Sequence, residues 1–372
     1  MADNKQTQKA GENSQQIQAN TIIVNQGIDE KRAREICAET FEIAKRDFTQ
    51  EAMACATERV QQLENRIMSR MLPIEGAISS FADPAFQVLL TNAQRTAVAS
   101  EREADYDLLS ELLICHIEKG EARKTRTGIS KAVEIVDKID DDALCALTIM
   151  YSITTLLPVT TSCKQGINVL SNLFNKLEYM DLPSGSDWIE HLEILNTLRV
   201  NTLSHFRRFE DYLPEKLPYY NHIGIKKESE EYKKALTLLS SVSLNIENLV
   251  TNDLMPDYIR LPFNQTENYD DVILTHIVRI GNDNVQVRLP ITNNHKKVFN
   301  EVFLLYDKSD NTRKEYKRLF MEEWNKYKSL SIIQKWWNEL PFSFDITHIG
   351  KVLAYTNAKR CDKDLPDLPL NL

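Results

Sequence analysis

The sequence predicts a mainly α-helical protein, an irregular helical bundle or short solenoid. It also predicts an N-terminal β-strand/long-helix oligomerisation stalk and a small C-terminal α+β part with one hairpin. Apolar residues recur at three- and four-residue steps over most of the 372 residues, the spacing of helices with one buried face. Short polar breaks separate these segments, and no fixed-period repeat connects them. Antiparallel helices around a shared core are the architecture this pattern favours.

Composition restricts the class of protein. Hydrophobic residues make up 42% of the chain, and no apolar run approaches the roughly 18 residues that cross a bilayer. The N-terminus lacks the features of a signal peptide, and the six cysteines include no C-x-x-C pair. We therefore expect a cytoplasmic protein with reduced cysteines and no membrane partner. A net charge of −9 argues against broad affinity for nucleic acid, because phosphate neutralisation needs a basic surface.

The N-terminal residues predict a tail followed by a strand. Residues 1–16 are polar and cannot offset the entropy cost of ordering, so a mobile tail is expected. Residues 17–24 are rich in β-branched side chains and end at a Gly-containing turn signal. A strand beside a solitary helix leaves backbone groups unpaired, so it needs the rest of the chain or other copies. The candidate residues for oligomerisation in this run are Ile17, Ile22, Ile23 and Val24.

A long charged helix is predicted over 29–71, with Asp29 as its N-cap and Pro73 beyond its end. Phe41, Phe48 and Ala52 belong to an apolar stripe on one face. Such a stripe packs either against its own domain or against another chain, and the adjoining strand favours the second reading. Residues 17–72 are thus predicted to form an oligomerisation unit, with these three residues among its contacts.

Residues 73–255 are predicted to form a helical domain. Asp83 is expected to cap a helix that has Pro84 in its first turn. Further helices are predicted at 106–117, 131–139, 143–157, 167–180, 188–209 and 230–250. The final domain, 256–372, contains two strand-like runs, 272–280 and 285–289, around a Gly-Asn turn that indicates a hairpin. Its predicted helices are 295–306, 311–328, 332–338 and 347–359, with Trp324, Trp336 and Trp337 expected to lie against the hairpin.

Motifs for catalysis, cofactors and metals are absent from the sequence. It has no phosphate-binding loop, no G-x-S-x-G and no H-E-x-x-H. Asp140, Asp141 and Asp142 are interpreted as a helix-capping cluster, because no second acidic cluster stands at ligand spacing. We assign no catalytic, cofactor-binding or metal-binding residue. Acidic residues from separate helices could still gather a magnesium ion, so a metal-dependent nuclease, or another enzyme with an unrecognised site, stays as an alternative.

The densest basic segment lies in the C-terminal part. Lys314, Lys317, Arg318 and Lys328 alternate with aromatic residues, a pattern that can place cations on phosphates and rings on bases. Neighbouring glutamates dilute the charge, and an amphipathic helix with buried aromatics explains the pattern equally well. Nucleic-acid binding through these four residues is a second alternative, and we expect no measurable affinity at physiological salt.

Several segments resemble a known family. The residues concerned are Asn25-Gln26-Gly27-Ile28, Phe81-Ala82-Asp83-Pro84-Ala85-Phe86-Gln87 and the closing segment from Ile346 to Arg360. They are similar to an uncharacterised bacterial protein family, some of whose relatives are associated with phage-defence loci. The resemblance covers 17–157 and 342–372, and it implies an assembling, mostly helical protein with a role in defence sensing. None of these motifs is catalytic.

The leading functional hypothesis is a non-enzymatic, homo-oligomeric interaction or sensor protein. The strand-and-helix segment would assemble copies, and the divergent region 160–340 would meet a partner, either a protein ligand or a phage component. No cofactor is expected.

Overall fold

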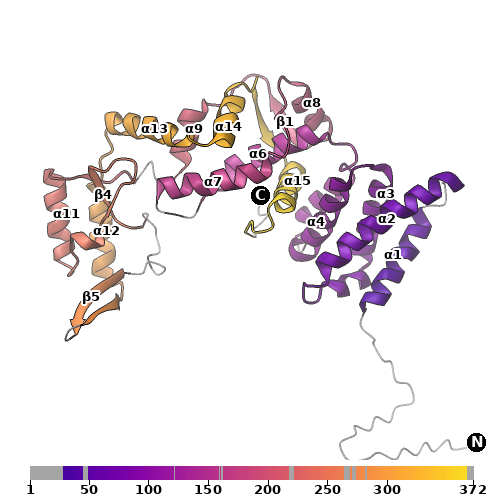
Figure 1. Cartoon of the computed structure of the whole chain (residues 1–372), viewed down its shortest axis with the longest axis horizontal. Coiled ribbons are helices and arrows are strands. Elements are labelled where there is room, and N and C mark those ends of the chain that lie inside the picture. The colour runs from indigo at the N-terminus through magenta and orange to yellow at the C-terminus, as the bar shows by residue number, and fades with distance from the viewer. Residues whose placement is uncertain are drawn as a thin grey trace, which may run out of the picture.

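The computed structural model describes residues 28–44, 49–120, 122–158, 160, 162–217, 222–263, 269, 274–280 and 283–366. The predicted tail, the predicted strand at 17–24 and Phe48 lie outside these residues. Within them most of the chain is helical, with a few short antiparallel strands. The predicted mainly α class, with a small α+β part, is confirmed (Figure 1).

The predicted helix over 29–71 is two helices in the structure, α1 (Glu30–Ala44) and α2 (Gln50–Met71). The Asp29 carboxylate accepts the Arg32 amide at 2.8 Å, so the expected cap of the first helix is present. Thr49 has an extended backbone, and its hydroxyl accepts the Ala52 amide at 3.4 Å. A threonine in this conformation starts a new helix. The break lets α1 turn back and pack against α3 (Pro84–Ala99).

The next elements form the rest of the N-terminal bundle. A 3₁₀ turn, η1 (Ala77–Ala82), leads to Asp83, which caps α3 as predicted by accepting the Ala85 amide at 2.9 Å. The bundle continues through α4 (Glu103–Lys119), α5 (Arg123–Val133) and α6 (Asp141–Thr155). Helix α5 begins eight residues before the predicted start at 131. Gly128 weakens the helical pattern there, but the position needs glycine, because a Cβ would lie 2.7 Å from Cδ2 of His348.

The middle of the chain contains a strand where helix was predicted. Helix α7 (Cys163–Leu177) is followed by α8 (Asp187–Ile194), β1 (Leu198–Asn201) and α9 (Phe209–Lys216). The predicted helix 188–209 therefore ends at α8. Asn196 adopts a positive φ of 58°, which stops the helix. Strand β1 pairs antiparallel with β7 (Ser343–Ile346), with Leu198 opposite Ile346.

Residues 225–306 build a second, smaller hydrophobic cluster. Its strands are β2 (Ile225–Lys226), β3 (Val250–Thr251) and β4 (Tyr258–Arg260), in the order β2-β4-β3, and its helical elements are α11 (Glu230–Ser240), η2 (Ile246–Asn248) and α12 (Asn293–Leu304). The predicted hairpin is present as β5 (Leu274–Ile280) and β6 (Asp283–Leu289), with Leu274 opposite Leu289. Buried aromatic rings from α12, including Phe299 and Phe303, form the centre of the cluster.

The last helices return to the main core. They are α13 (Asp310–Trp324), α14 (Lys328–Asn338) and α15 (His348–Cys361). The main cluster therefore joins residues from both sides of the boundary expected at 255/256. The three tryptophans of α13 and α14 are buried, as expected, but not against the hairpin. The ring centroids of Trp324 and Phe209 are 5.1 Å apart, and those of Trp337 and Phe206 are 5.0 Å apart. Trp336 packs on Trp188 of α8.

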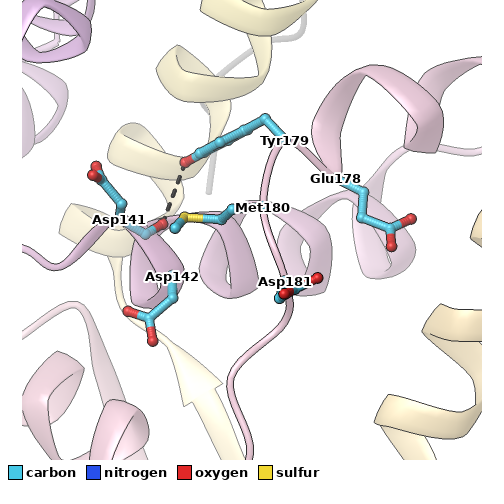
Figure 2. Close-up of a pocket in the computed structure, with 6 residues that line it drawn as sticks. All are labelled: Asp141, Asp142, Glu178, Tyr179, Met180 and Asp181. Carbon is cyan, nitrogen blue, oxygen red and sulfur yellow. Dashed lines mark hydrogen bonds between the residues drawn. The ribbon is translucent and has the colours of Figure 1, made fainter.

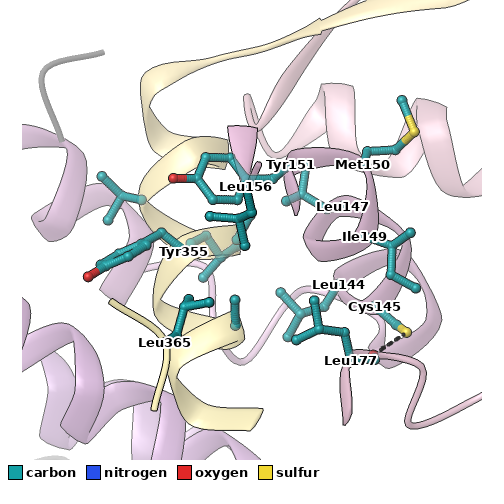
Figure 3. Packing of buried hydrophobic residues seen from close by; sticks show 14 of the residues in the cluster. Leu144, Cys145, Leu147, Ile149, Met150, Tyr151, Leu156, Leu177, Tyr355 and Leu365 are labelled. Atoms are coloured by element: carbon teal, nitrogen blue, oxygen red, sulfur yellow. Dashed lines mark hydrogen bonds between the residues drawn. The ribbon is translucent and has the colours of Figure 1, made fainter. Parts of the chain in front are cut away.

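Helix α15 lies between α4, α5 and α6 in the middle of the molecule (Figure 1). Side chains of α6, α7 and α15 pack together in Figure 3. On one side of this contact lie Leu144, Leu147 and Leu177, and on the other lie Tyr355 and Leu365. Almost every residue of α6 is buried. The α6–α15 seam is therefore the centre of the hydrophobic core.

None of the helices in the described part of the chain combines the length and the apolar character that crossing a membrane requires.

A buried carboxylate fixes the start of α4. Asp105 is 2% exposed and accepts hydrogen bonds from the Ser100 hydroxyl and, at 3.0 Å, from Nε of Arg102. Burial raises the pKa of Asp105, while the Arg102 guanidinium acts in the opposite direction. The same guanidinium donates to Asp141 at 3.0 Å and to the Val136 carbonyl at 2.9 Å. Arg102 thus connects the first turn of α4 with the first turn of α6.

We expect Arg102→Leu to lower the free energy of unfolding by about 3 kcal/mol, because it leaves the Asp105 carboxylate buried without its cation. Urea denaturation followed by circular dichroism measures this change. The control is Arg199→Leu at an exposed position of β1, which should change stability by less than about 0.5 kcal/mol. Equal stability of the two variants would contradict the role given to Arg102.

His348, the first residue of α15, makes stability depend on pH. Both of its ring nitrogens are buried and have no hydrogen-bond partner in the described part of the chain. Burial lowers the pKa of His348, and the charges of Lys124 and Lys351 lower it further, whereas the backbone of Lys124 acts in the opposite direction. The unfolded chain therefore takes up a proton near pH 6.5 at which the folded chain stays neutral. The contribution of neutral His348 to the free energy of unfolding is fully present above that pH and is lost as the pH falls below it.

We expect the melting temperature to fall between pH 7.5 and pH 5, and His348→Gln to reduce the slope of that decrease. Thermal melts monitored by circular dichroism at several pH values give the slope. His205→Gln, at an exposed position, is the matched control and should keep the wild-type slope. Identical slopes for the wild type and His348→Gln would refute the assignment.

Candidate functional site

The predicted oligomerisation residues lie in different surroundings. Phe41 is 6% exposed and packs within its own chain, in a small cluster with Ala56, Val60 and Val98. Ala52 is exposed. Ile17, Ile22, Ile23, Val24 and Phe48 are outside the described residues. The structure thus brings Phe41 into the bundle and leaves Ala52 on its surface.

The first turns of α2 form an exposed apolar end. Buried residues of this helix begin only at Ala56, whereas Ala52, Ala54 and Cys55 are exposed and Met53 is half-buried. Ile43, near the end of α1, is 55% exposed. In Figure 1 this end of α2 projects at the right-hand edge of the molecule. We call Ala52–Cys55 the exposed end of α2.

The predicted nucleic-acid residues are partly neutralised by carboxylates. Lys317 pairs with Glu215 at 2.8 Å and with Asp211 at 3.3 Å, both on α9. Arg318 pairs with Glu315 at 2.7 Å and also with Glu322. The hydrogen bonds from Arg318 lower the pKa of Glu315, and those from Lys317 and Arg207 lower the pKa of Glu215. These ion pairs reduce the positive potential that a phosphate would meet.

The aromatic residues of the predicted site are also used in packing within the chain. Tyr316 and Trp324 are buried within the chain. The indole N–H of Trp324 donates to the Leu330 carbonyl at 2.7 Å, and that of Trp337 donates to the Arg207 carbonyl at 2.9 Å. A hollow of about 620 Å³ lies beside Lys317 and Arg318, but Glu210, Asp211 and Glu322 also line it. Rings buried in this way cannot stack on bases.

We expect the full chain to show no measurable binding to single- or double-stranded DNA at about 150 mM salt. Fluorescence anisotropy with labelled oligonucleotides tests this, and the four-fold variant K314Q/K317Q/R318Q/K328Q should give the same flat titration. Micromolar binding that weakens steeply between about 50 and 200 mM salt, and that the four substitutions abolish, would overturn this expectation.

An acidic hollow of about 660 Å³ lies between α6 and the segment after α7 (Figure 2). Asp141 and Asp142 come from the first turn of α6, and Glu178, Tyr179, Met180 and Asp181 from that segment. Burial and the neighbouring Asp181 charge raise the pKa of Glu178, while Lys328 opposes them.

These carboxylates do not converge on one point. Figure 2 shows Asp141, Asp142 and Glu178 pointing in different directions, and no group of three potential metal ligands comes together among the described residues. Asp141 is paired with Arg102, and Asp142 accepts the Ala143 amide at 2.7 Å. Both carboxylates lie in the first turn of α6, but the predicted cap is wrong: Asp140, the residue before the helix, makes no side-chain cap hydrogen bond.

Behind the hollow, Tyr179 connects its wall to the core. Its hydroxyl donates to the Asp141 carbonyl at 3.5 Å and accepts from the Asn357 amide at 3.3 Å. Arg360 lies over its ring at 5.1 Å and donates to Asn357 at 2.8 Å. Burial raises the pKa of Tyr179. Tyr179 thus connects the wall of the hollow to α6 and α15.

A third hollow was missed by the sequence reasoning. It lies along α5, where Arg123, Arg126 and Lys131 line it together with His116 of α4. The prediction placed the helix at 131–139 and so treated 123–130 as a connection. Three basic residues within four positions, Arg123, Lys124 and Arg126, were the signal that could have revealed a cationic helix start.

The fold defines a mainly α-helical protein with a small α+β cluster and without a recognisable catalytic centre in its described part. One family model matches residues 27–368. The chain therefore belongs to this uncharacterised family. Comparisons with curated proteins and with solved structures found no match.

Proposed function

We propose that this chain is a non-enzymatic interaction protein that assembles with copies of itself through its N-terminal part. The observation that supports the proposal is the exposed end of α2. Four consecutive apolar residues begin a helix there, three of them exposed, with Glu51 the nearest charge in the same turn. Covering apolar surface gains about 25 cal/mol per Å².

Small residues suit a contact between helices. Ala52 and Ala54 allow two backbones to approach closely, whereas larger side chains would hold them apart. Ile43, near the end of α1, is a further exposed apolar residue in the N-terminal part. Residues 17–24, with their strand-like composition, add backbone groups that can pair between copies.

The resemblance to relatives at phage-defence loci supports a role in sensing. An assembling protein can hold its ligand-responsive part in several copies, so that a protein ligand or a phage component meets a multivalent surface. A plaque assay on cells with and without the gene tests this role. Equal phage titres on both strains, over a panel of phages, would argue against a role in defence.

Light scattering coupled to gel filtration tests assembly directly. The full chain is expected to give a multiple of 42.9 kDa, and deletion of residues 1–28 is expected to lower that multiple while leaving helical content unchanged. Ala52→Asp should act in the same direction, because it places a charge in the contact. A mass of one chain at every concentration would end the proposal.

Cys55 supplies a second readout, because it is the exposed cysteine among the six of the chain. If copies meet at the exposed end of α2, a short bis-maleimide should cross-link the protein into dimers, seen on a denaturing gel. Cys55→Ser should abolish this product, and Cys361→Ser should retain it. A dimer that forms equally in Cys55→Ser would show that the contact lies elsewhere.

A further inference from the structure

The hollow along α5 is lined by three cations, and the two arginines among them differ from the basic residues of α13 in their pairing. It has a volume of about 330 Å³ and lies between α3, α4 and α5. Arg123 and Arg126 form no ion pair with a carboxylate in the part of the chain that the structure describes. Lys131, at the far end, pairs with Glu134 at 2.6 Å. Lys317 and Arg318 of α13, by contrast, are paired with carboxylates.

The two arginines act on the same side of the helix. Positions 123, 126 and 130 are spaced by three and four residues, so Arg123, Arg126 and Ser130 share one face of α5. Ala122 precedes the helix and supplies no side-chain cap. The free amides of the first turn therefore add to the positive potential of the two guanidinium groups.

His116 of α4 also lines the hollow. Its Nδ1 is buried and has no hydrogen-bond partner in the described structure. Burial lowers the pKa of His116, whereas the charge of Asp83, whose carboxylate accepts the Ala85 amide, acts in the opposite direction.

The opposite wall is apolar. Val88 of α3 is 63% exposed, and Leu89 beside it is buried. A ligand held by the arginines would cover Val88. The site therefore combines guanidinium groups, a hydroxyl group and an apolar wall within a volume suited to a small organic molecule.

We propose that this hollow binds a small organic phosphate monoester, with the phosphate between Arg123 and Arg126 and its apolar part against Val88. Two guanidinium groups donate paired hydrogen bonds to phosphate oxygens more effectively than single amines do. The Ser130 hydroxyl adds a donor on the same face. This site is separate from the exposed end of α2, so either proposal can fail without the other.

Phenyl phosphate is the probe, with inorganic phosphate and benzoate as comparisons, titrated into the full-length chain by isothermal calorimetry. Saturable binding of phenyl phosphate is expected, at least tenfold tighter than that of inorganic phosphate or benzoate. The double variant R123Q/R126Q should weaken it at least tenfold. The matched control Arg199→Gln, an exposed arginine on β1, should leave it unchanged.

Val88→Ser separates the apolar contact from the charge. It should weaken phenyl phosphate several-fold while leaving inorganic phosphate unchanged. Circular dichroism melts of all variants verify the fold, since the substituted residues are exposed. No saturable binding, or equal affinity of the folded double variant, would overturn the proposal. Equal affinity for benzoate would overturn the choice of phosphate, and an unchanged Val88→Ser would remove the apolar wall from the site.

Discussion

Helix α15 carries the end of the described chain back into the N-terminal bundle, where it packs against α4, α5 and α6. Its buried side includes a polar residue, Asn357, which is fully buried and donates to the Thr148 hydroxyl at 2.8 Å. A buried amide is tolerated only when its hydrogen bonds are satisfied, so this pair fixes the register between α15 and α6. Two close approaches hold the helix elsewhere: Gly128 makes room for His348, and a Cβ at Gly350 would overlap the Thr197 carbonyl oxygen.

The rest of the molecule is arranged around this insertion. Strand β7 leads directly into α15 and pairs with β1, so the position of α15 also sets that of α8. The tryptophans of α13 and α14 fill the space beside α8 and α9. Residues 225–306 contribute most of a second, aromatic cluster. Leu254 and Tyr258 from the same stretch belong to the main core and connect the two clusters along the chain.

Local pairing, not net charge, decides where the surface can attract an anion. The chain is acidic overall, at −9, and its most basic stretch lies on α13, where carboxylates of α9 and of α13 itself meet Lys317 and Arg318. On α5 the packing against α3 and α4 places apolar residues, not carboxylates, opposite Arg123 and Arg126. Opposite charges within about 4 Å largely cancel the potential seen by a ligand.

The sequence by itself determined the helical class, the caps at Asp29 and Asp83, and the hairpin, because these follow from periodicity and from contacts within a few residues. Tertiary structure decided the rest. The pairing of β1 with β7 joins residues more than 140 positions apart, and the partners of the tryptophans are similarly remote. The candidate site on α5 could not be predicted for the same reason. Gly128 locally disfavours a helix, and only the close approach of the His348 ring from α15 explains why glycine is needed there. Contacts of this kind have no local signature in the sequence, since they depend on which distant side chain occupies the space.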